Sequence, residues 1–94
     1  MFTIIIPTFN NLKYLKLCLD SIKKNSRFNH EIIIHINEGI DGTINFLNNN
    51  EFKSTYSKLN TGVCVAFNKA ANEATNKYLL LAHDDMYFCP GWDQ

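Results

Sequence analysis

The sequence predicts an α/β protein built on a parallel sheet. Runs of apolar, β-branched residues alternate with segments that repeat their apolar residues at helical spacing. The runs are apolar at nearly every position, as in strands covered on both faces. The 94 residues contain no internal repeat, low-complexity tract or long linker. At this length a chain buries roughly 60–65% of its unfolded surface, so we expect residues 1–94 to form a single domain.

The first strand is predicted over residues 2–6, where Pro7 closes a β-branched run. The helix that follows can be capped by Asn10 or Asn11, and polar residues 25–27 end it. Its apolar face recurs at steps of three and four residues: Leu12, Leu15, Leu19 and Ile22.

A second buried strand is predicted over residues 31–36, followed by a glycine-bearing loop at residues 37–43 and a short helix over residues 43–48. Residues 53–59 are polar and are interpreted as an edge strand.

A third helix follows Asn60-Thr61-Gly62, with an inward face made of small and apolar residues: Val63, Phe67, Ala70, Ala71 and Ala74. The fourth strand, residues 78–82, has the composition of a buried parallel strand and runs directly into His83-Asp84-Asp85.

The adjacent carboxylates of Asp84 and Asp85 are the most informative feature. Parallel strands place their ligands at the carboxyl edge of the sheet. Two carboxylates there repel each other and favour a divalent metal, a base or ribose hydroxyls as partners. The loops expected at this edge contribute Thr8, Asn10, Asn37, Glu38, Asp41, Asp84 and Asp85. No Lys or Arg is predicted at the strand ends, so a diphosphate would bind there only with Mg²⁺ or Mn²⁺.

Other functions are disfavoured by composition and motif. Nine basic and nine acidic residues balance, so the chain lacks the electrostatic footprint of a nucleic-acid or anionic-membrane binder. Neither GxGxxG nor a Walker sequence is present. Three cysteines without CxxC spacing argue against a zinc site and for a reducing compartment. The richness in Asn, Lys and Ile is typical of bacterial genome composition.

Five blocks together carry a resemblance: residues 4–10 (IIIPTFN), 37–43 (NEGIDGT), 60–62 with 66–68 (NTG, AFN), 83–85 (HDD) and 90–92 (PGW). In this order and spacing they resemble the family 2 glycosyltransferases of the GT-A fold over almost the whole chain. The resemblance implies a Rossmann-like, three-layer αβα half-domain with about four parallel strands in the order 3-2-1-4.

The resemblance also implies roles for individual residues. Thr8 and Asn10 match the nucleotide-binding end of the first strand, and Asn37 and Glu38 match the pair that contacts the base. Asp84 matches the ribose-side acid, and Asp85 matches the carboxylate that holds Mn²⁺ or Mg²⁺ on the donor diphosphate. The donor would be a nucleoside-diphosphate sugar.

The sequence departs from the family pattern in the loop after the second strand, which is one residue short. Asn37 is uncharged there, so the base need not be uracil. Phe67 replaces an Arg that many members place near the diphosphate.

Structural alternatives stay open for several of these residues. Asp84 and Asp85 could cap the following turn, Thr8 and Asn10 could serve a helix cap, and Glu38 and Asp41 could be turn residues. His35 and Trp92 are interpreted as structural.

In the resembled family a second half supplies the acceptor site and the catalytic base, and no residue up to Gln94 matches that base. We therefore expect these residues to be the donor-binding half of a longer, hexosyltransferase-type enzyme, inactive alone. The fourth strand would then be an exposed apolar edge that favours a homo-oligomer.

The expected location is cytoplasmic, or the cytoplasmic face of the membrane for a longer parent. Two alternatives remain: a catalytically inert nucleotide-sugar-binding or interaction module, and, with less support, a receiver-like phosphoacceptor domain.

Overall fold

The computed structural model describes residues 2–37, 41–57, 63–76 and 78–93, with the backbone alone for residues 63–66. The elements follow the order β1 (Thr3–Phe9), α1 (Leu12–Asn25), β2 (Glu31–Asn37), α2 (Thr43–Asn49), β3 (Lys53–Ser57), α3 (Val63–Ala71) and β4 (Leu79–Leu81). The strands form one sheet in the order β3-β2-β1-β4, and each neighbouring pair is parallel. The predicted sheet and its strand order are confirmed.

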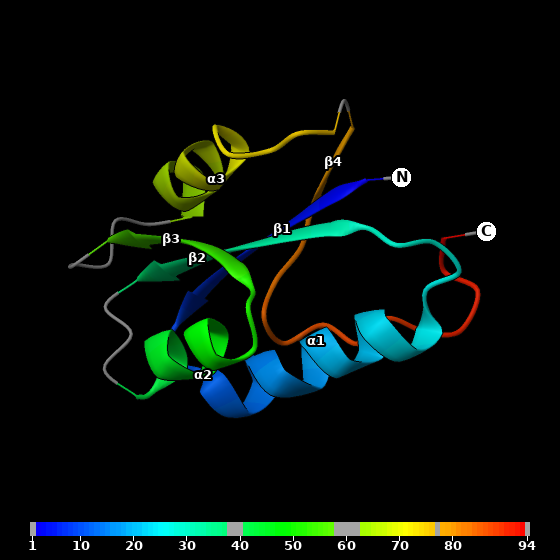
Figure 1. The fold of residues 1–94 in the computed structure, drawn as a ribbon, viewed down its shortest axis with the longest axis horizontal. Coiled ribbons are helices and arrows are strands. Elements are labelled where there is room, and N and C mark those ends of the chain that lie inside the picture. The colour runs from blue at the N-terminus through cyan, green and yellow to red at the C-terminus, as the bar shows by residue number, and fades with distance from the viewer. Residues whose placement is uncertain (1, 38–40, 58–62, 77, 94) are drawn as a thin grey trace.

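The sheet is covered on both faces, by α1 and α2 on one side and by α3 on the other (Figure 1). Alternation along the strands divides the core between these faces. Ile4 and Ile6 of β1 belong to the cluster under α1 and α2, whereas Ile5 packs with Ile33 and Ala70 under α3. The predicted three-layer αβα architecture follows from this division.

Strand β1 continues through Pro7, where the sequence suggested that it ends. The backbone N–H of Thr3 donates to Tyr78, and the carbonyl of Ile5 accepts from Ala82, so every second residue of β1 faces β4. Pro7 is the next residue in this series, and the pairing with β4 stops at Ile5. Because β4 does not pair with β1 at this position in the described part of the chain, the missing N–H of Pro7 removes no ladder hydrogen bond.

Strand β4 is shorter and more exposed than predicted. The sequence indicated a buried strand over residues 78–82, but Leu79 and Leu81 are 44% and 54% exposed. Helix α3 packs over β1, β2 and β3, and β4 lies at the edge of the sheet. The apolar residues Leu79 and Leu81 of β4 therefore lie at an edge of the sheet that α3 does not cover.

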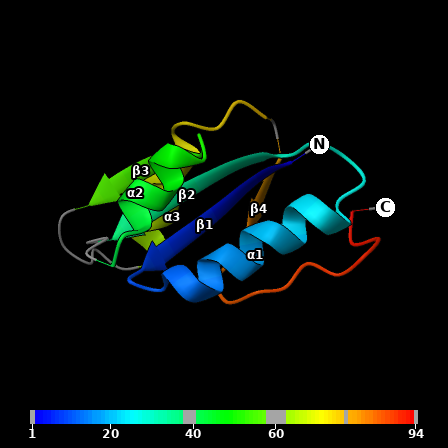
Figure 2. The same ribbon diagram turned by 60° about the horizontal axis from the view of Figure 1, so that its bottom comes forward.

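The chain after β4 runs back along α1 (Figures 1 and 2). Asn25 donates from its amide to the carbonyl of Phe88 at 2.7 Å, and the N–H of Phe88 donates to the Ser21 hydroxyl at 2.9 Å. Trp92 packs on the core, and its ring lies 4.8 Å from that of Phe88. The interpretation of Trp92 as a packing residue is consistent with these contacts.

Candidate functional site at the carboxyl edge of the sheet

The carboxyl ends of β1 and β4 are joined by a direct side-chain contact. The Thr8 hydroxyl donates to Oδ2 of Asp84 at 2.8 Å. Thr8 is buried, and Asp84 is half-buried. Two residues predicted for nucleotide binding from separate loops therefore lie together, as the parallel topology requires.

Asp85 differs from its neighbour in both exposure and contacts. It is exposed, and it makes no hydrogen bond or ion pair within the described residues. Neither carboxylate caps the following turn, whose contact is a 3.3 Å bond from the N–H of Met86 to the carbonyl of His83. In this arrangement Asp84 is fixed by Thr8, while Asp85 is available to a ligand.

Cys18 of α1 lies close enough to this edge for its pKa to be affected by the negative charge there. Its buried thiol lies 3.6 Å from the carbonyl oxygen of His83. Burial raises the pKa of Cys18 to about 12, and the nearby carboxylates of Asp84 and Asp85 add to that rise. The thiol therefore stays protonated and serves as a small buried hydrophobe.

The other predicted nucleotide-binding residues are more scattered. Asn10 adopts a left-handed backbone conformation, with φ 46°, between β1 and α1. Asn37 ends β2 opposite Phe9 but is only 4% exposed. It follows Ile33 and His35 on the sheet face that α3 covers, so it lies on the opposite face from Thr8. Glu38 lies outside the described residues.

The expected helix cap comes from a different loop. Asn11 holds the N-cap position of α1 without a side-chain cap bond. Instead, Oδ2 of Asp41 accepts from the N–H of Leu12 at 2.9 Å, and Oδ1 accepts from the N–H of Thr43 at 3.2 Å. Burial would raise the pKa of Asp41, but these bonds and one from the Thr43 hydroxyl outweigh it and lower the pKa. Asp41 thus stabilises the starts of two helices.

One basic residue at this edge was not predicted from the sequence. Lys69 of α3 donates from Nζ to the Ser57 hydroxyl at 3.1 Å, at the carboxyl end of β3. The expectation that no Lys or Arg reaches the strand ends is therefore wrong. Its position within the third helical pattern was visible, but the direction of its side chain depends on how α3 docks on the sheet.

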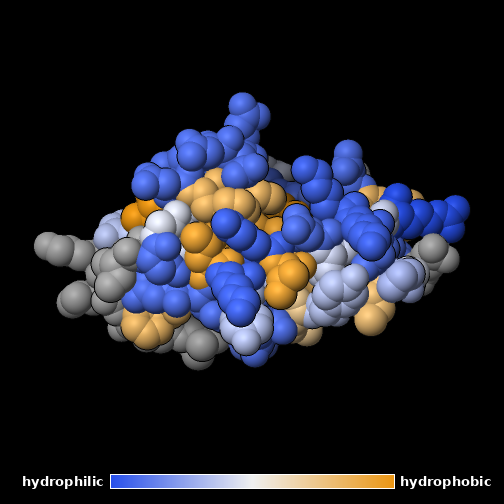
Figure 3. All heavy atoms as spheres, turned by 90° about the horizontal axis from the view of Figure 1, so that it is seen from below, coloured by the Kyte–Doolittle hydropathy of each residue, from blue (hydrophilic) through white to orange (hydrophobic). Residues whose placement is uncertain are grey.

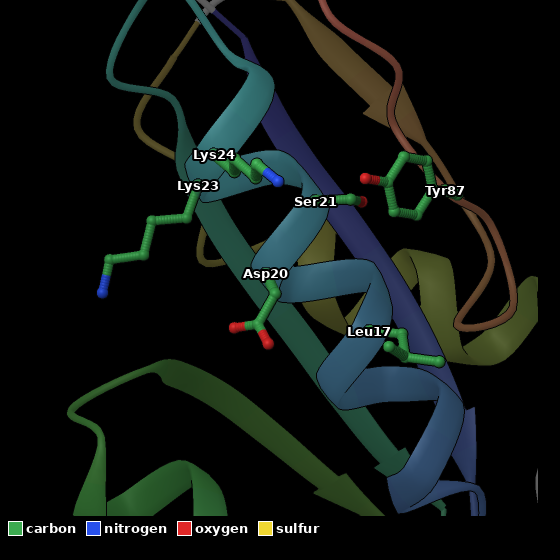
Figure 4. Close-up of a pocket in the computed structure, with 6 residues that line it drawn as sticks. All are labelled: Leu17, Asp20, Ser21, Lys23, Lys24 and Tyr87. Carbon is green, nitrogen blue, oxygen red and sulfur yellow. The ribbon is translucent and has the colours of Figure 1, made fainter.

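Two surface pockets among the described residues lie along α1. One, of about 510 Å³, is lined by Leu17, Asp20, Ser21, Lys23, Lys24 and Tyr87, and Tyr87 faces Ser21 across it (Figure 4). The other, of about 560 Å³, lies beside the end of α1 and the turn before β3. Figure 3 views this side of the molecule, where hydrophilic residues surround smaller apolar areas. In the described residues no helix is long and apolar enough to cross a membrane.

Similar folds occur in solved structures of S. aureus TarS. The structure of TarS residues 1–349 has a TM-score of 0.81 and 23% identity, covering 92% of this chain and 28% of that chain. Its complex with UDP has a TM-score of 0.80 and 24% identity, with coverage of 92% and 28%. The complex with UDP-GlcNAc has a TM-score of 0.74 and 26% identity, with coverage of 92% and 27%. The chain thus spans less than a third of the length of these structures.

Sequence comparison identifies the family directly. No curated protein matches the chain. The family described as Glycosyl transferase family 2 matches residues 3–94, which include every strand and helix of the structure. The chain therefore belongs to glycosyl transferase family 2.

Proposed function

We propose that this chain binds the nucleoside-diphosphate sugar donor of a glycosyltransferase that transfers the sugar to an acceptor hydroxyl. The bond between Thr8 and Asp84 carries this proposal, because it joins two family motifs at one edge of the sheet. The family match and the fold shared with TarS, which was crystallised with UDP and UDP-GlcNAc, support it.

The side chains at this edge suit different parts of such a donor. Asp84, oriented by Thr8, would accept hydrogen bonds from the ribose hydroxyls. Asn37 would contact the base, with Asn10 and Glu38 as further predicted contacts. Asp85, which is exposed and makes no hydrogen bond or ion pair within the described residues, would face the diphosphate.

A divalent metal, Mn²⁺ or Mg²⁺, fits the donor set only with help from the ligand. Among the described residues, no group of three or more His, Cys, Asp or Glu side chains could hold a metal. Magnesium sites of this kind use one or two carboxylates together with phosphate oxygens. Asp85 would hold the metal, which would neutralise charge on the diphosphate leaving group. We expect metal and nucleotide to bind together.

No residue described here is nominated as the catalytic base. Inverting transfer to a hydroxyl requires a carboxylate placed to remove its proton. We therefore expect this chain, which spans 28% of the first TarS structure, to bind the donor without turning it over. The alternative, an inert nucleotide-sugar-binding module, shares the same site and would show binding without transfer in any longer parent.

Calorimetric titration with UDP, with and without Mn²⁺, tests the proposal. We expect binding that needs Mn²⁺ and that Asp85→Asn weakens by about tenfold or more, the scale of one lost charge-assisted contact. Asp20→Asn is the control, because Asp20 is an exposed acid on α1 away from the strand ends. Equal metal-dependent binding by Asp85→Asn, or no UDP binding by the wild-type chain, would overturn the proposal.

Self-association and location also belong to the proposal. The exposed Leu79 and Leu81 of edge strand β4 support a homo-oligomer formed through that edge. The cytoplasmic location, or the cytoplasmic face of the membrane for a longer parent, stays a prediction.

A further inference from the structure

A lysine side chain of α3 reaches the carboxyl end of the edge strand β3, one strand beyond Asn37. Nζ of Lys69 donates to the hydroxyl of Ser57 at 3.1 Å, and Ser57 is the last residue of β3. In the parallel register Ser57 is paired with Asn37. Neighbouring strands lie about 4.8 Å apart. The Lys69 ammonium is therefore bonded to the residue beside the one that is predicted to contact the base.

The ammonium of Lys69 has donor capacity left for a ligand. An ammonium carries three hydrogens and no acceptor, and within the described residues Lys69 uses one of them, in the bond to Ser57. Lys69 is exposed, whereas Ser57 and Asn37 are 5% and 4% exposed. Of these three side chains, Lys69 is the one that a ligand reaches most easily.

Lys69 also supplies the charge at this end of the sheet. Nε2 of the fully buried His35 lies 3.0 Å from the Ser57 hydroxyl. Burial lowers the pKa of His35, and the positive charge of Lys69 lowers it further. The ring of His35 is therefore neutral at neutral pH, and the cation beside Ser57 is the ammonium of Lys69.

The strand order sets the direction in which a nucleotide would lie along this edge. Asp84 and Asp85 follow β4, Asn37 ends β2, and β1 lies between these two strands. In the proposed function the ribose and diphosphate lie at the β4 end and the base lies at β2. The far edge of the base, away from the ribose, then points toward β3, where Lys69 lies.

We propose that Lys69 is a specificity-determining residue that donates a hydrogen bond to a carbonyl oxygen on the far edge of the base. The inference rests on the proposed function, because it assumes a donor whose base lies at Asn37. Uracil and guanine carry a carbonyl oxygen on this edge, whereas cytosine and adenine carry an amino group. An ammonium can only donate, so it pairs with the carbonyl and not with the amino group. The substrate class is a uracil or guanine nucleotide.

Calorimetric titration with UDP and with CDP in the presence of Mn²⁺ tests this inference. The two nucleotides share the ribose and the diphosphate and differ along the edge of the base. We expect the wild-type chain to bind UDP at least about tenfold more tightly than CDP, the scale of one hydrogen bond to a charged group. In Lys69→Met this preference should fall about tenfold, through weaker binding of UDP.

Two further variants are the controls. Lys69→Arg keeps a cation that only donates, so it should keep part of the preference for UDP. Lys24 is an exposed lysine on α1, and Lys24→Met should keep the wild-type ratio. Because Lys69 is also exposed, Lys69→Met should fold, and its midpoint of thermal unfolding checks this.

The outcomes separate the inference from the proposed function. If the wild-type chain binds neither nucleotide, the proposed function fails and the inference fails with it. If the wild-type chain binds both equally, or prefers CDP, the inference alone fails, and no variant is needed to show it. If Lys69→Met keeps the wild-type ratio, either with unchanged affinities or with UDP and CDP weakened by the same factor, Lys69 does not read the base and the inference is overturned.

Discussion

The Thr8 hydroxyl donates to the Asp84 carboxylate at 2.8 Å, across 76 positions of sequence. The bond ties the end of the central strand to the end of the edge strand. It also holds one acid of the adjacent pair still, while the other, Asp85, stays exposed.

Thr8→Val tests this bond with little change of shape. It leaves Asp84 without its donor, and we expect a loss of about 1–2 kcal/mol in the free energy of unfolding. Thr8→Ser keeps a hydroxyl and should lose less. Urea denaturation followed by the fluorescence of Trp92, the single tryptophan, provides the measurement. No loss in Thr8→Val would show that the bond does not stabilise the fold.

Glu51→Gly should stabilise the protein. Glu51 has φ 59° and ends α2 in a Schellman motif, with N–H bonds from Glu51 to Asn48 and from Phe52 to Leu47. The left-handed conformation strains a non-glycine residue by about 1–2 kcal/mol, and glycine adds unfolded-state entropy of about 0.4–1 kcal/mol. A net gain of roughly 0.5–1 kcal/mol follows from these two terms.

The control for this prediction is Glu51→Ala, which removes the carboxylate but keeps the strain. Glu51→Gly should raise the midpoint of thermal unfolding, and Glu51→Ala should not. Equal midpoints for the two variants would mean that the charge, rather than the backbone conformation, accounts for any change.

Acid should loosen the segment after β4. Burial would raise the pKa of Asp93, but N–H bonds from Arg27 and Phe28 and a bond from the His30 ring lower it from 3.8 to about 2. A lowered pKa gives stability that is present above pH 3.8 and is lost as the pH falls through about 2. Trp92 lies 5.1 Å from His30, so its fluorescence reports this region.

Asp93→Asn should therefore flatten the dependence of stability on pH in that window. Glu31, whose pKa falls from 4.5 to about 2 through bonds that outweigh its burial, titrates over nearly the same range. Asp41, whose pKa is also lowered, adds a third contribution to the wild-type curve. The variant should retain the contributions of Glu31 and Asp41 and lose that of Asp93. Superimposable curves for the two proteins would contradict the assignment.

Leu81→Lys should weaken self-association through β4. Leu81 is 54% exposed on the edge strand, and Leu17, which is 52% exposed on α1, is a matched control. Light scattering across a concentration series should show that Leu81→Lys is more monomeric than Leu17→Lys. A wild-type protein that stays monomeric at high concentration would exclude this interface.

Local sequence patterns were sufficient to predict the order and type of the helices and strands. The isoleucine runs of β1 and β2 are buried on both faces, and such runs form central parallel strands. The apolar run of β4 led to the wrong prediction of a buried strand, because composition alone does not show whether a second layer covers a strand. Leu79 and Leu81 are exposed where α3 does not extend over them.

The candidate site was predictable where it depends on strand ends and not where it depends on docking. Thr8 and Asp84 meet because parallel strands deliver their ends to one edge. The cap supplied by Asp41 and the approach of Lys69 to Ser57 depend on the packing of loops and helices, which no local pattern encodes.

The most direct test of the account is a crystal of the chain grown with MnCl₂ and UDP, examined by anomalous scattering from manganese. The account predicts a manganese peak in contact with the Asp85 carboxylate and with the diphosphate, and the ribose beside Asp84. An ordered UDP bound without manganese at Asp85, or a strand edge empty of both, would contradict it.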